Sequence, residues 1–229
     1  MVIVKNHLIE LLAKEDQVSL LAIADPIELV MDEVLSEPGR QVEHVYFPTD
    51  GSISMVALID GHPGLEVAMI GSEGMLGAHL SLGVTSASLH TQVRHGGASW
   101  RIGVTSFCAE LALSRTLQHG LHRYLHVLFK QQARSVACLH YHLIGPRMAR
   151  WLLMSQDRAH SDSFYVTHEF LARMLGVRRT GITEAAVALQ RSGLIDYHRG
   201  NLTILNRLGL EAVACSCYAA DQENYAELY

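Results

Sequence analysis

Two arginines and two threonines stand close together in the C-terminal third of the chain. Arg178 and Arg179 are followed by Thr180 and Thr183, and a helical periodicity places all four on the outer side of one helix's first turns. Guanidinium and hydroxyl groups are donors with which proteins contact the phosphates and base edges of nucleic acids. These four side chains therefore indicate a nucleic-acid-binding surface.

Residues 167–195 predict the two helices that position this surface. Thr167 can cap the first helix, and Gly176 ends it, while Gly193 ends the second. Apolar residues follow a spacing of three and four in both helices: Phe170, Leu171, Met174 and Leu175 in the first, and Ile182, Ala185, Ala186 and Leu189 in the second. Two helices joined by such a short turn make a helix-turn-helix. A helical hairpin without a role in DNA binding is the alternative.

A β-hairpin is predicted directly after the second helix, over residues 194–205. Two apolar runs flank His198 and Arg199, and Gly200 with Asn201 suits a tight turn with positive φ. A hairpin in this place makes a winged helix, with His198 and Arg199 able to meet phosphate. An ordinary solvated turn is the alternative for these two side chains.

The distribution of charge agrees with a nucleic-acid surface at this place. The whole chain has a formal net charge of −5 and a sequence pI near 6.3, which would argue against nucleic acid. Residues 147–210, however, hold nine arginines and five acidic residues, whereas residues 1–146 and 211–229 are both acidic. The basic segment contains the motif, so we expect strongly salt-dependent binding.

This order of helix, glycine turn, basic helix and wing resembles the C-terminal domain of the CRP/FNR family (cyclic-AMP receptor and fumarate-nitrate regulator) of bacterial transcription factors. The resemblance implies an α+β chain: an N-terminal cyclic-nucleotide-binding-like β-roll over residues 1–113, a dimerisation helix and hinge over 114–145, and a winged helix-turn-helix over 146–229. It implies a cytoplasmic, homodimeric, sequence-specific transcriptional regulator that binds palindromic double-stranded DNA and is not an enzyme. It also allows RNA polymerase as a further partner.

The resemblance assigns roles on the second helix residue by residue. Arg179 matches the family's recognition-helix arginine, whose guanidinium can bridge guanine O6 and N7. Thr180 and Glu184 replace a glutamate and an arginine that are common there, which implies a different target site. Arg178 occupies the position where the family often has a capping serine. Gly181 permits close approach to the DNA backbone. The other phosphate candidates are Thr167, His168, His198 and Arg199.

The first hundred residues predict a sandwich or barrel of short strands. Candidates are residues 45–47, 53–59, 65–70, 89–93 and 98–104, separated by the turn segments PTDG, DGHPG, GSEGMLG and HGG. The segments HVYFPTDGSIS and MIGSEGMLG resemble the β-roll of the same family, which commonly holds an effector pocket. The candidate pocket residues are Gly71, Glu73, Gly77, Ala78, Ser86 and Ser88.

The sequence departs from the family at the positions that bind cyclic nucleotides. Ala78 stands where a glutamate meets the ribose, and Ser86, Ala87 and Ser88 surround the position of the arginine that meets the phosphate. The nearest arginine is Arg94, one strand further on. A buried phosphate without a bidentate cation would be poorly compensated. We therefore expect no cyclic-AMP binding in the family's manner, and the effector is unknown.

The helix predicted over residues 114–143 should join the two domains and form the dimer. A seven-residue repeat along it predicts a self-complementary seam. The candidate seam residues are Leu121, Tyr124, Leu125, Leu128 and Ser135. Gly145 and Pro146 should break the helix at a hinge. Two-fold symmetry would place the recognition helices about 34 Å apart.

The four cysteines predict reduced thiols rather than a metal or iron–sulfur site. Cys108 is the first of them, so the N-terminal cluster of oxygen-sensing relatives is missing from the sequence. Cys215 and Cys217 fall on an apparent C-terminal helix, where side chains two residues apart point in different directions. Neither a metal nor a cofactor is predicted, and redox control through Cys108 or Cys138 stays open.

Two alternatives stay open, and the histidines bear on both. A haem, metal or thiol-redox sensor on the same fold is one group, since His119, His122 and His126 share one helix face. A metal-dependent barrel enzyme is the other, and its ligands would be His79, His90 and His95. Residues 1–16 predict an amphipathic helix rather than a signal peptide. We expect no association with a membrane.

Overall fold

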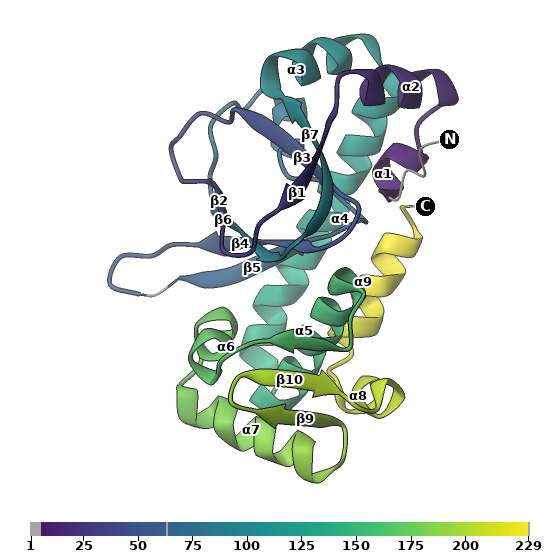
Figure 1. The fold of residues 1–229 in the computed structure, drawn as a ribbon. Coiled ribbons are helices and arrows are strands. Elements are labelled where there is room, and N and C mark those ends of the chain that lie inside the picture. Colours follow the sequence, from purple (N-terminus) through teal and green to yellow (C-terminus); the bar gives the residue numbers. More distant parts are fainter. Residues whose placement is uncertain (1–5, 63, 229) are drawn as a thin grey trace.

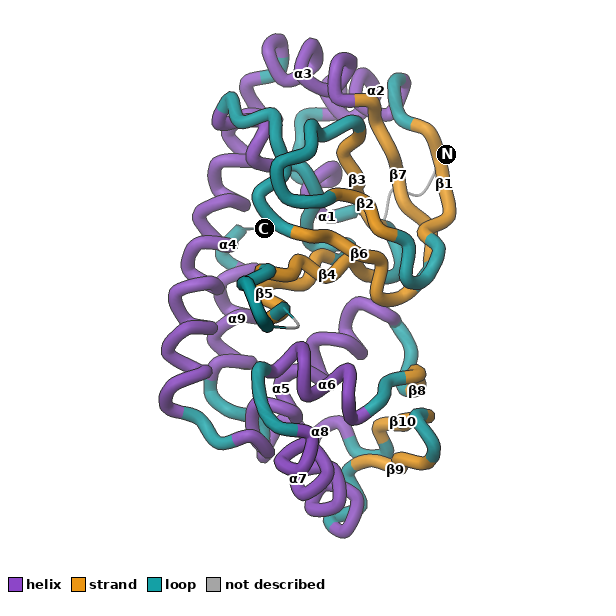
Figure 2. The backbone as a smooth tube through the Cα atoms, turned by 90° about the vertical axis from the view of Figure 1, so that its left-hand side faces the viewer, coloured by secondary structure: helices purple, strands orange, loops and turns teal. Residues whose placement is uncertain are grey.

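The computed structural model describes residues 6–62 and 64–228. A β-rich body and a mostly helical body lie one above the other, and the long helix α4 (Arg115–Tyr141) runs along the side of both (Figure 1, Figure 2). In the described part of the chain, no helix is long and apolar enough to cross a bilayer.

Antiparallel strands form two sheets in the N-terminal body. The strands are β1 (Asp25–Leu29), β2 (Val34–Ser36), β3 (His44–Pro48), β4 (Ser52–Ala57), β5 (Leu65–Ile70), β6 (His90–His95) and β7 (Gly97–Gly103). One sheet has the order β1-β7-β3 and the other β2-β6-β4-β5. The five predicted strands are confirmed as β3 to β7. Sequence analysis missed β1, because its segment DPIEL buries Leu29 and leaves its charged residues exposed.

Four short helices pack into one hydrophobic core with strands of this β-roll. They are α1 (His7–Glu10), α2 (Lys14–Ala22), the 3-10 helix η1 (Ala78–Leu82) and α3 (Val104–Leu113). The single N-terminal helix predicted over residues 1–16 is wrong from residue 6 onward, and its first five residues lie outside the described chain. Asn6 explains the change, because its side-chain amide donates to the carbonyls of Pro48 and Gly74, both at 2.8 Å.

The buried face of α4 is part of the β-roll core. The Ser114 hydroxyl caps the helix by accepting from the Leu117 amide at 3.0 Å. Leu121 and Tyr124 are 1% and 0% exposed and pack inside their own chain. This corrects the predicted dimer seam at these two positions, because neither side chain can face a second copy. Along the opposite face, Phe129 and Val136 are exposed.

The helical body is a winged helix-turn-helix with its own core. Its elements are α5 (Ile144–Ala159), β8 (Ser163–Tyr165), α6 (His168–Leu175), α7 (Arg179–Arg191), β9 (Ile195–His198), β10 (Asn201–Ile204) and α8 (Arg207–Val213). Strand β10 lies between β8 and β9. The hinge predicted at Gly145 and Pro146 is corrected, because the helix breaks earlier, at His142 and Leu143. Pro146 instead falls within the first turn of α5, where no amide donor is required.

The last helix, α9 (Cys217–Ala226), leaves the winged helix and packs beside α4 (Figure 1). Asp221 on α9 accepts from Arg150 at 2.6 Å and from Arg134 at 3.2 Å. Tyr225 and Leu228 reach the core that contains Leu121 and Tyr124. The C-terminal segment therefore connects both bodies.

Buried polar contacts join the β-roll directly to the winged helix. Glu66 on β5 accepts from the indole N–H of Trp151 at 2.7 Å. Arg94 on β6 donates to the Tyr165 carbonyl at 2.8 Å and lies 3.9 Å above the Phe170 ring. Burial raises the pKa of Glu66, and hydrogen bonds from its partners oppose that rise. The two bodies are thus held in one arrangement by specific donors and acceptors.

His95 lies at the same junction and couples it to pH. Its Nδ1 is 2.8 Å from the Ser52 hydroxyl, and its ring packs edge-on against Phe164 with centroids 5.5 Å apart. Burial first, and then the charge of Arg94, lowers the pKa of His95 to about 4. The folded protein therefore resists a proton that the unfolded chain accepts near its ordinary pKa of about 6.5.

We expect the free energy of unfolding to fall as the pH drops through this window. The contribution of His95 is fully present above about pH 6.5 and is lost as the pH falls to about 4, with an upper limit of roughly 3 kcal/mol. Urea unfolding at about pH 7 and pH 4.5 should show a smaller pH dependence in His95→Gln than in the native protein. The exposed His62→Gln variant is the control. Equal pH dependence in all three proteins would contradict this assignment.

Candidate nucleic-acid interface

The predicted caps and buried faces of the helix-turn-helix are confirmed. The Thr167 hydroxyl accepts from the Phe170 amide at 3.1 Å, and Gly176 ends α6 in the left-handed region with φ 62°. The buried side of α7 consists of Ile182, Ala185, Ala186 and Leu189. This burial fixes the rotation of α7. The predicted DNA-contacting residues Arg178, Arg179, Thr180, Thr183 and Glu184 are all exposed as a result.

The start of α7 is arranged for an anion. Arg178 is its N-cap residue, and Arg179 occupies its first turn. The N-terminus of a helix carries a partial positive charge, so two arginines there are unfavourable for the isolated helix. The same combination of amide donors, helix dipole and guanidinium groups favours a bound phosphate.

His168 joins three elements of this surface. Its Nδ1 is 3.0 Å from the Thr183 hydroxyl on α7, and its ring packs on Tyr197 of β9 with centroids 4.8 Å apart. Tyr197 in turn donates to the Val166 carbonyl at 2.6 Å. Burial and then the charge of Arg179 lower the pKa of His168. As a neutral ring, His168 holds the recognition helix and the wing together.

The wing differs from the predicted hairpin by one residue. Arg199 and Gly200 form the turn, with φ values of 49° and 87°, whereas Asn201 pairs with His198 in the ladder. The prediction of Gly200 with Asn201 was therefore wrong. The physical reason is local: Tyr165 covers Gly200 so closely that an added Cβ would lie 2.5 Å from its ring. His198 and Arg199 are both exposed at the end of the hairpin.

Gly181 serves a contact that sequence analysis did not identify. A Cβ at this position would lie 2.6 Å from the side chain of Ile144, at the start of α5. The glycine lets the recognition helix pack against the residue that follows the hinge. Its placement in a helix, where glycine is costly by about 1 kcal/mol, was the available signal.

Four of the nine arginines in the winged helix are not available to a ligand. Arg147, Arg150 and Arg158 are buried, and Arg207 pairs with Asp157 at 2.7 Å. Of the nine arginines between residues 147 and 210, all described, five are exposed: Arg173, Arg178, Arg179, Arg191 and Arg199. The regional count used in the sequence analysis therefore overstates the basic surface, although the exposed part includes the start of α7 and the wing.

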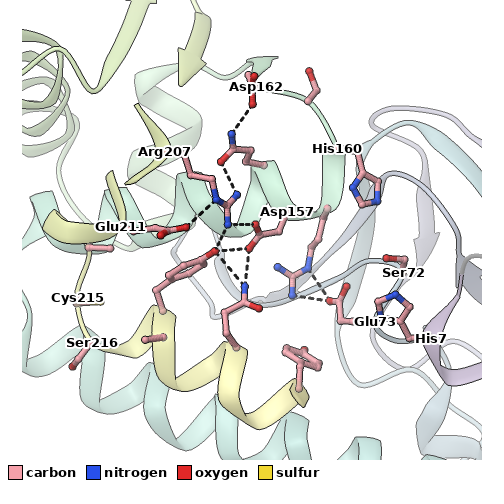
Figure 3. Close-up of a pocket in the computed structure, with 18 residues that line it drawn as sticks. His7, Ser72, Glu73, Asp157, His160, Asp162, Arg207, Glu211, Cys215 and Ser216 are labelled. Carbon is pink, nitrogen blue, oxygen red and sulfur yellow. Dashed lines mark hydrogen bonds and ion pairs between the residues drawn. The ribbon is translucent and has the colours of Figure 1, made fainter. Parts of the chain in front are cut away.

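A polar groove of about 990 Å³ lies between the two bodies (Figure 3). Glu73 on its wall pairs with Arg158 at 2.7 Å, and Tyr218 donates to Asp157 at 2.9 Å. A Cβ at Gly71 would lie 2.7 Å from the Arg158 side chain. Gly71 and Glu73 were predicted in an effector pocket. Neither residue lines the cavity inside the β-roll: Glu73 lines this groove, and Gly71 packs on Arg158.

The β-roll contains a second, smaller cavity next to α4. Gly77, Ala78 and Ser88 line it, together with Leu125 and Leu128 from α4, and its volume is about 160 Å³. Ser86 instead forms an isolated bridge with Gln41 and is not part of that lining in the described chain. Ligand pockets usually measure about 300–1,000 Å³, so the cavity is small.

The ionisable groups near this cavity do not suit a phosphate. Among the described lining residues, His79 is the one titratable side chain, and burial lowers its pKa. The guanidinium of Arg94 is directed to the winged helix. His95 contacts Ser52 and Phe164, so His79, His90 and His95 form no cluster in the described chain.

Sequence analysis also missed a group of four side chains where α4 ends and α9 begins. Cys215 precedes α9 and Cys217 begins it, so the two are not on one helix as predicted. Both approach Cys138 and His142 at the end of α4. The helix face of His119, His122 and His126 remains exposed.

Comparison with known proteins agrees with this geometry. The model of the Crp-like helix-turn-helix domain matches residues 146–213. Among curated proteins, none matches the sequence. A CRP/FNR-family transcriptional regulator from Eubacterium rectale has a similar structure, with TM-score 0.70 and 17% identity over 90% of this chain and 96% of its own.

Two further solved structures share the fold. FixK2 from Bradyrhizobium japonicum has TM-score 0.70 and 15% identity, covering 85% of this chain and 98% of its own. The c-di-GMP-responsive global regulator CLP from Xanthomonas campestris has TM-score 0.63 and 17% identity, covering 84% and 99%. Residues 146–213 therefore form a Crp-like helix-turn-helix domain, and the chain as a whole has the fold of these CRP/FNR-type structures.

Proposed function

We propose that the chain is a cytoplasmic homodimer that reads a palindromic DNA site without cyclic AMP. The observation that carries this proposal is the exposed basic start of α7 beside the exposed wing tip. Arg178 and Arg179 are exposed at the start of α7, and Arg199 is exposed at the wing tip. Arg179 contacts a guanine edge, while Arg178, His198 and Arg199 bind phosphates on either side. RNA polymerase stays a predicted partner.

The exposed apolar face of α4 supports the dimer. Phe129, Val136 and Leu139 are 72%, 69% and 40% exposed, and they follow the spacing of a heptad repeat. Leu125 lies on the same line and is half-buried. We call these four residues the α4 stripe. An unpaired stripe of this kind favours a second copy of the same helix, with two-fold symmetry.

The small cavity in the β-roll supports independence from cyclic AMP. A cyclic phosphate bound there would lose water without gaining an arginine or lysine partner from the described lining.

The cysteines support the cytoplasmic location. The thiols of Cys138 and Cys215, whose sulfurs are 3.6 Å apart, are reduced, which fits a reducing compartment.

Substitution of Arg179 tests the assignment of the reading surface. We expect Arg179→Ala to weaken binding to a duplex selected from a randomised library by about 10- to 100-fold, since a bidentate arginine–guanine contact contributes roughly 1–3 kcal/mol. Fluorescence anisotropy at fixed salt measures the affinity. Arg191→Ala is the matched control, because Arg191 is exposed in the last turn of the same helix. Equal losses in both variants would refute the assignment.

The α4 stripe gives a separate prediction about assembly. We expect Val136→Glu to raise the dimer dissociation constant at least tenfold, because the carboxylate would be placed in an apolar seam. Sedimentation velocity at several protein concentrations measures it. Val18→Glu on α2 is the control, since Val18 is 70% exposed and lies off the stripe. A native protein that stays monomeric at micromolar concentration would contradict the dimer.

Cyclic AMP should leave the protein unaffected. Calorimetric titration into the native protein should give no binding heat, and the affinity for the selected duplex should change less than twofold. Stoichiometric binding with a rise in DNA affinity would overturn this part of the proposal.

A further inference from the structure

Three thiols and one imidazole converge where α4 ends and α9 begins. Cys138 lies in the last turn of α4, His142 follows that helix, and Cys215 and Cys217 come from the C-terminal segment. All four potential ligand atoms lie within 4.8 Å of one another. The three cysteines are buried, with 3%, 7% and 6% exposure. They come from segments more than 70 residues apart, so the tertiary fold alone creates the group.

Two of the six distances among these ligand atoms agree with the edges of a metal tetrahedron, and all six are within 4.8 Å. With Zn–S bonds near 2.3 Å and Zn–N bonds near 2.0–2.1 Å, a tetrahedral ion separates two sulfurs by about 3.8 Å and a sulfur and a nitrogen by about 3.5 Å. The Cys138 and Cys215 sulfurs are 3.6 Å apart, and the Cys217 sulfur lies 3.6 Å from His142 Nδ1. A disulfide needs about 2.05 Å, so these sulfurs are in contact without being bonded.

The surroundings suit thiolate ligands. Arg147 and Arg150 are buried nearby, on the first turns of α5. Three thiolates with one divalent cation carry a net charge of −1, which the Arg147 guanidinium would balance, since Arg150 is already paired with Asp221. His142 is half-buried at the outer side of the group, where an ion can enter.

We propose that Cys138, His142, Cys215 and Cys217 form a four-coordinate site for a thiophilic divalent cation of the zinc type. Three thiolate donors and one imidazole donor in a tetrahedral arrangement select such an ion over magnesium or calcium. The site joins the end of α4 to the C-terminal segment across the hinge. There the Cys215 amide donates to the Pro146 carbonyl at 3.3 Å.

Cobalt binding by the reduced, chelator-treated full chain tests the site. We expect one Co²⁺ per chain, with thiolate charge-transfer and tetrahedral d–d absorption, and full displacement by Zn²⁺. The double variant Cys215→Ser, Cys217→Ser should weaken binding at least 100-fold. Cys108→Ser is the matched control, because Cys108 lies in α3, away from the group. Failure of the folded, reduced native protein to bind Co²⁺ would overturn the proposal.

Thiol protection keeps the test valid if the double variant does not fold. With Zn²⁺ bound, alkylation of the native protein followed by peptide mass mapping should modify Cys108 and spare the other three cysteines. A Cys138–Cys215 disulfide that forms in air and a failure of Zn²⁺ to protect the reduced thiols would together favour a redox pair and reject the metal site.

Occupancy of this site should also change DNA affinity, because it fixes the hinge between α4 and the winged helix. This step rests on the proposed DNA-binding function. We expect the metal-loaded protein and the stripped protein to differ at least fivefold in affinity for the selected duplex. Equal affinities with an intact cobalt spectrum would reject control of the hinge and leave the metal site standing. Loss of DNA binding in both forms would instead count against the proposed function.

Discussion

Burial of one face of α4 in the β-roll is the constraint on which the rest of the structure depends. Tyr124 is fully buried there, and Gly74 is small enough to admit it, since an added Cβ would lie 2.1 Å from the phenol oxygen. Once this face is fixed, the opposite face with Phe129 and Val136 must point outward. The position of the C-terminal end of α4, where the hinge begins, is fixed relative to the β-roll as well.

Arginine performs two separate tasks in the winged helix. Arg150 and Arg158 are buried against acidic partners, Asp221 and Glu73, and hold the bodies and the C-terminal helix together. Removing one partner of such a pair leaves an uncompensated buried charge, which is strongly destabilising. Arg179 and Arg199 have no comparable structural contact among the described residues and face solvent. Net charge alone does not distinguish these two groups, whereas burial does.

Local sequence signals predicted the parts whose structure is decided locally. The Thr167 cap, the Gly176 terminus and the buried stripe of α7 follow from side-chain chemistry and helical spacing, and the structure has all of them. The five strands with apolar runs were found for the same reason. The edge strand β1 was missed because its register comes from pairing with β7 rather than from its own pattern.

The features that sequence analysis missed depend on distant contacts. Leu121 fits a heptad as well as Phe129 does, and the β-roll core decides which of them is available to a partner. Glu73 follows a family-like glycine segment, yet its partner Arg158 lies 85 residues later. The approach of Cys215 to Cys138 likewise depends on α9 returning to α4, which no local pattern encodes.

The symmetry of the preferred DNA site tests the central claim most directly. Selection from a randomised duplex library with the ligand-free native protein, followed by sequencing, determines that site. The account predicts an inverted repeat whose half-sites are centred about one DNA turn apart, roughly 34 Å. Enrichment of a single asymmetric site, or no enrichment from ligand-free protein, would contradict a cyclic-AMP-independent dimer that reads a palindrome.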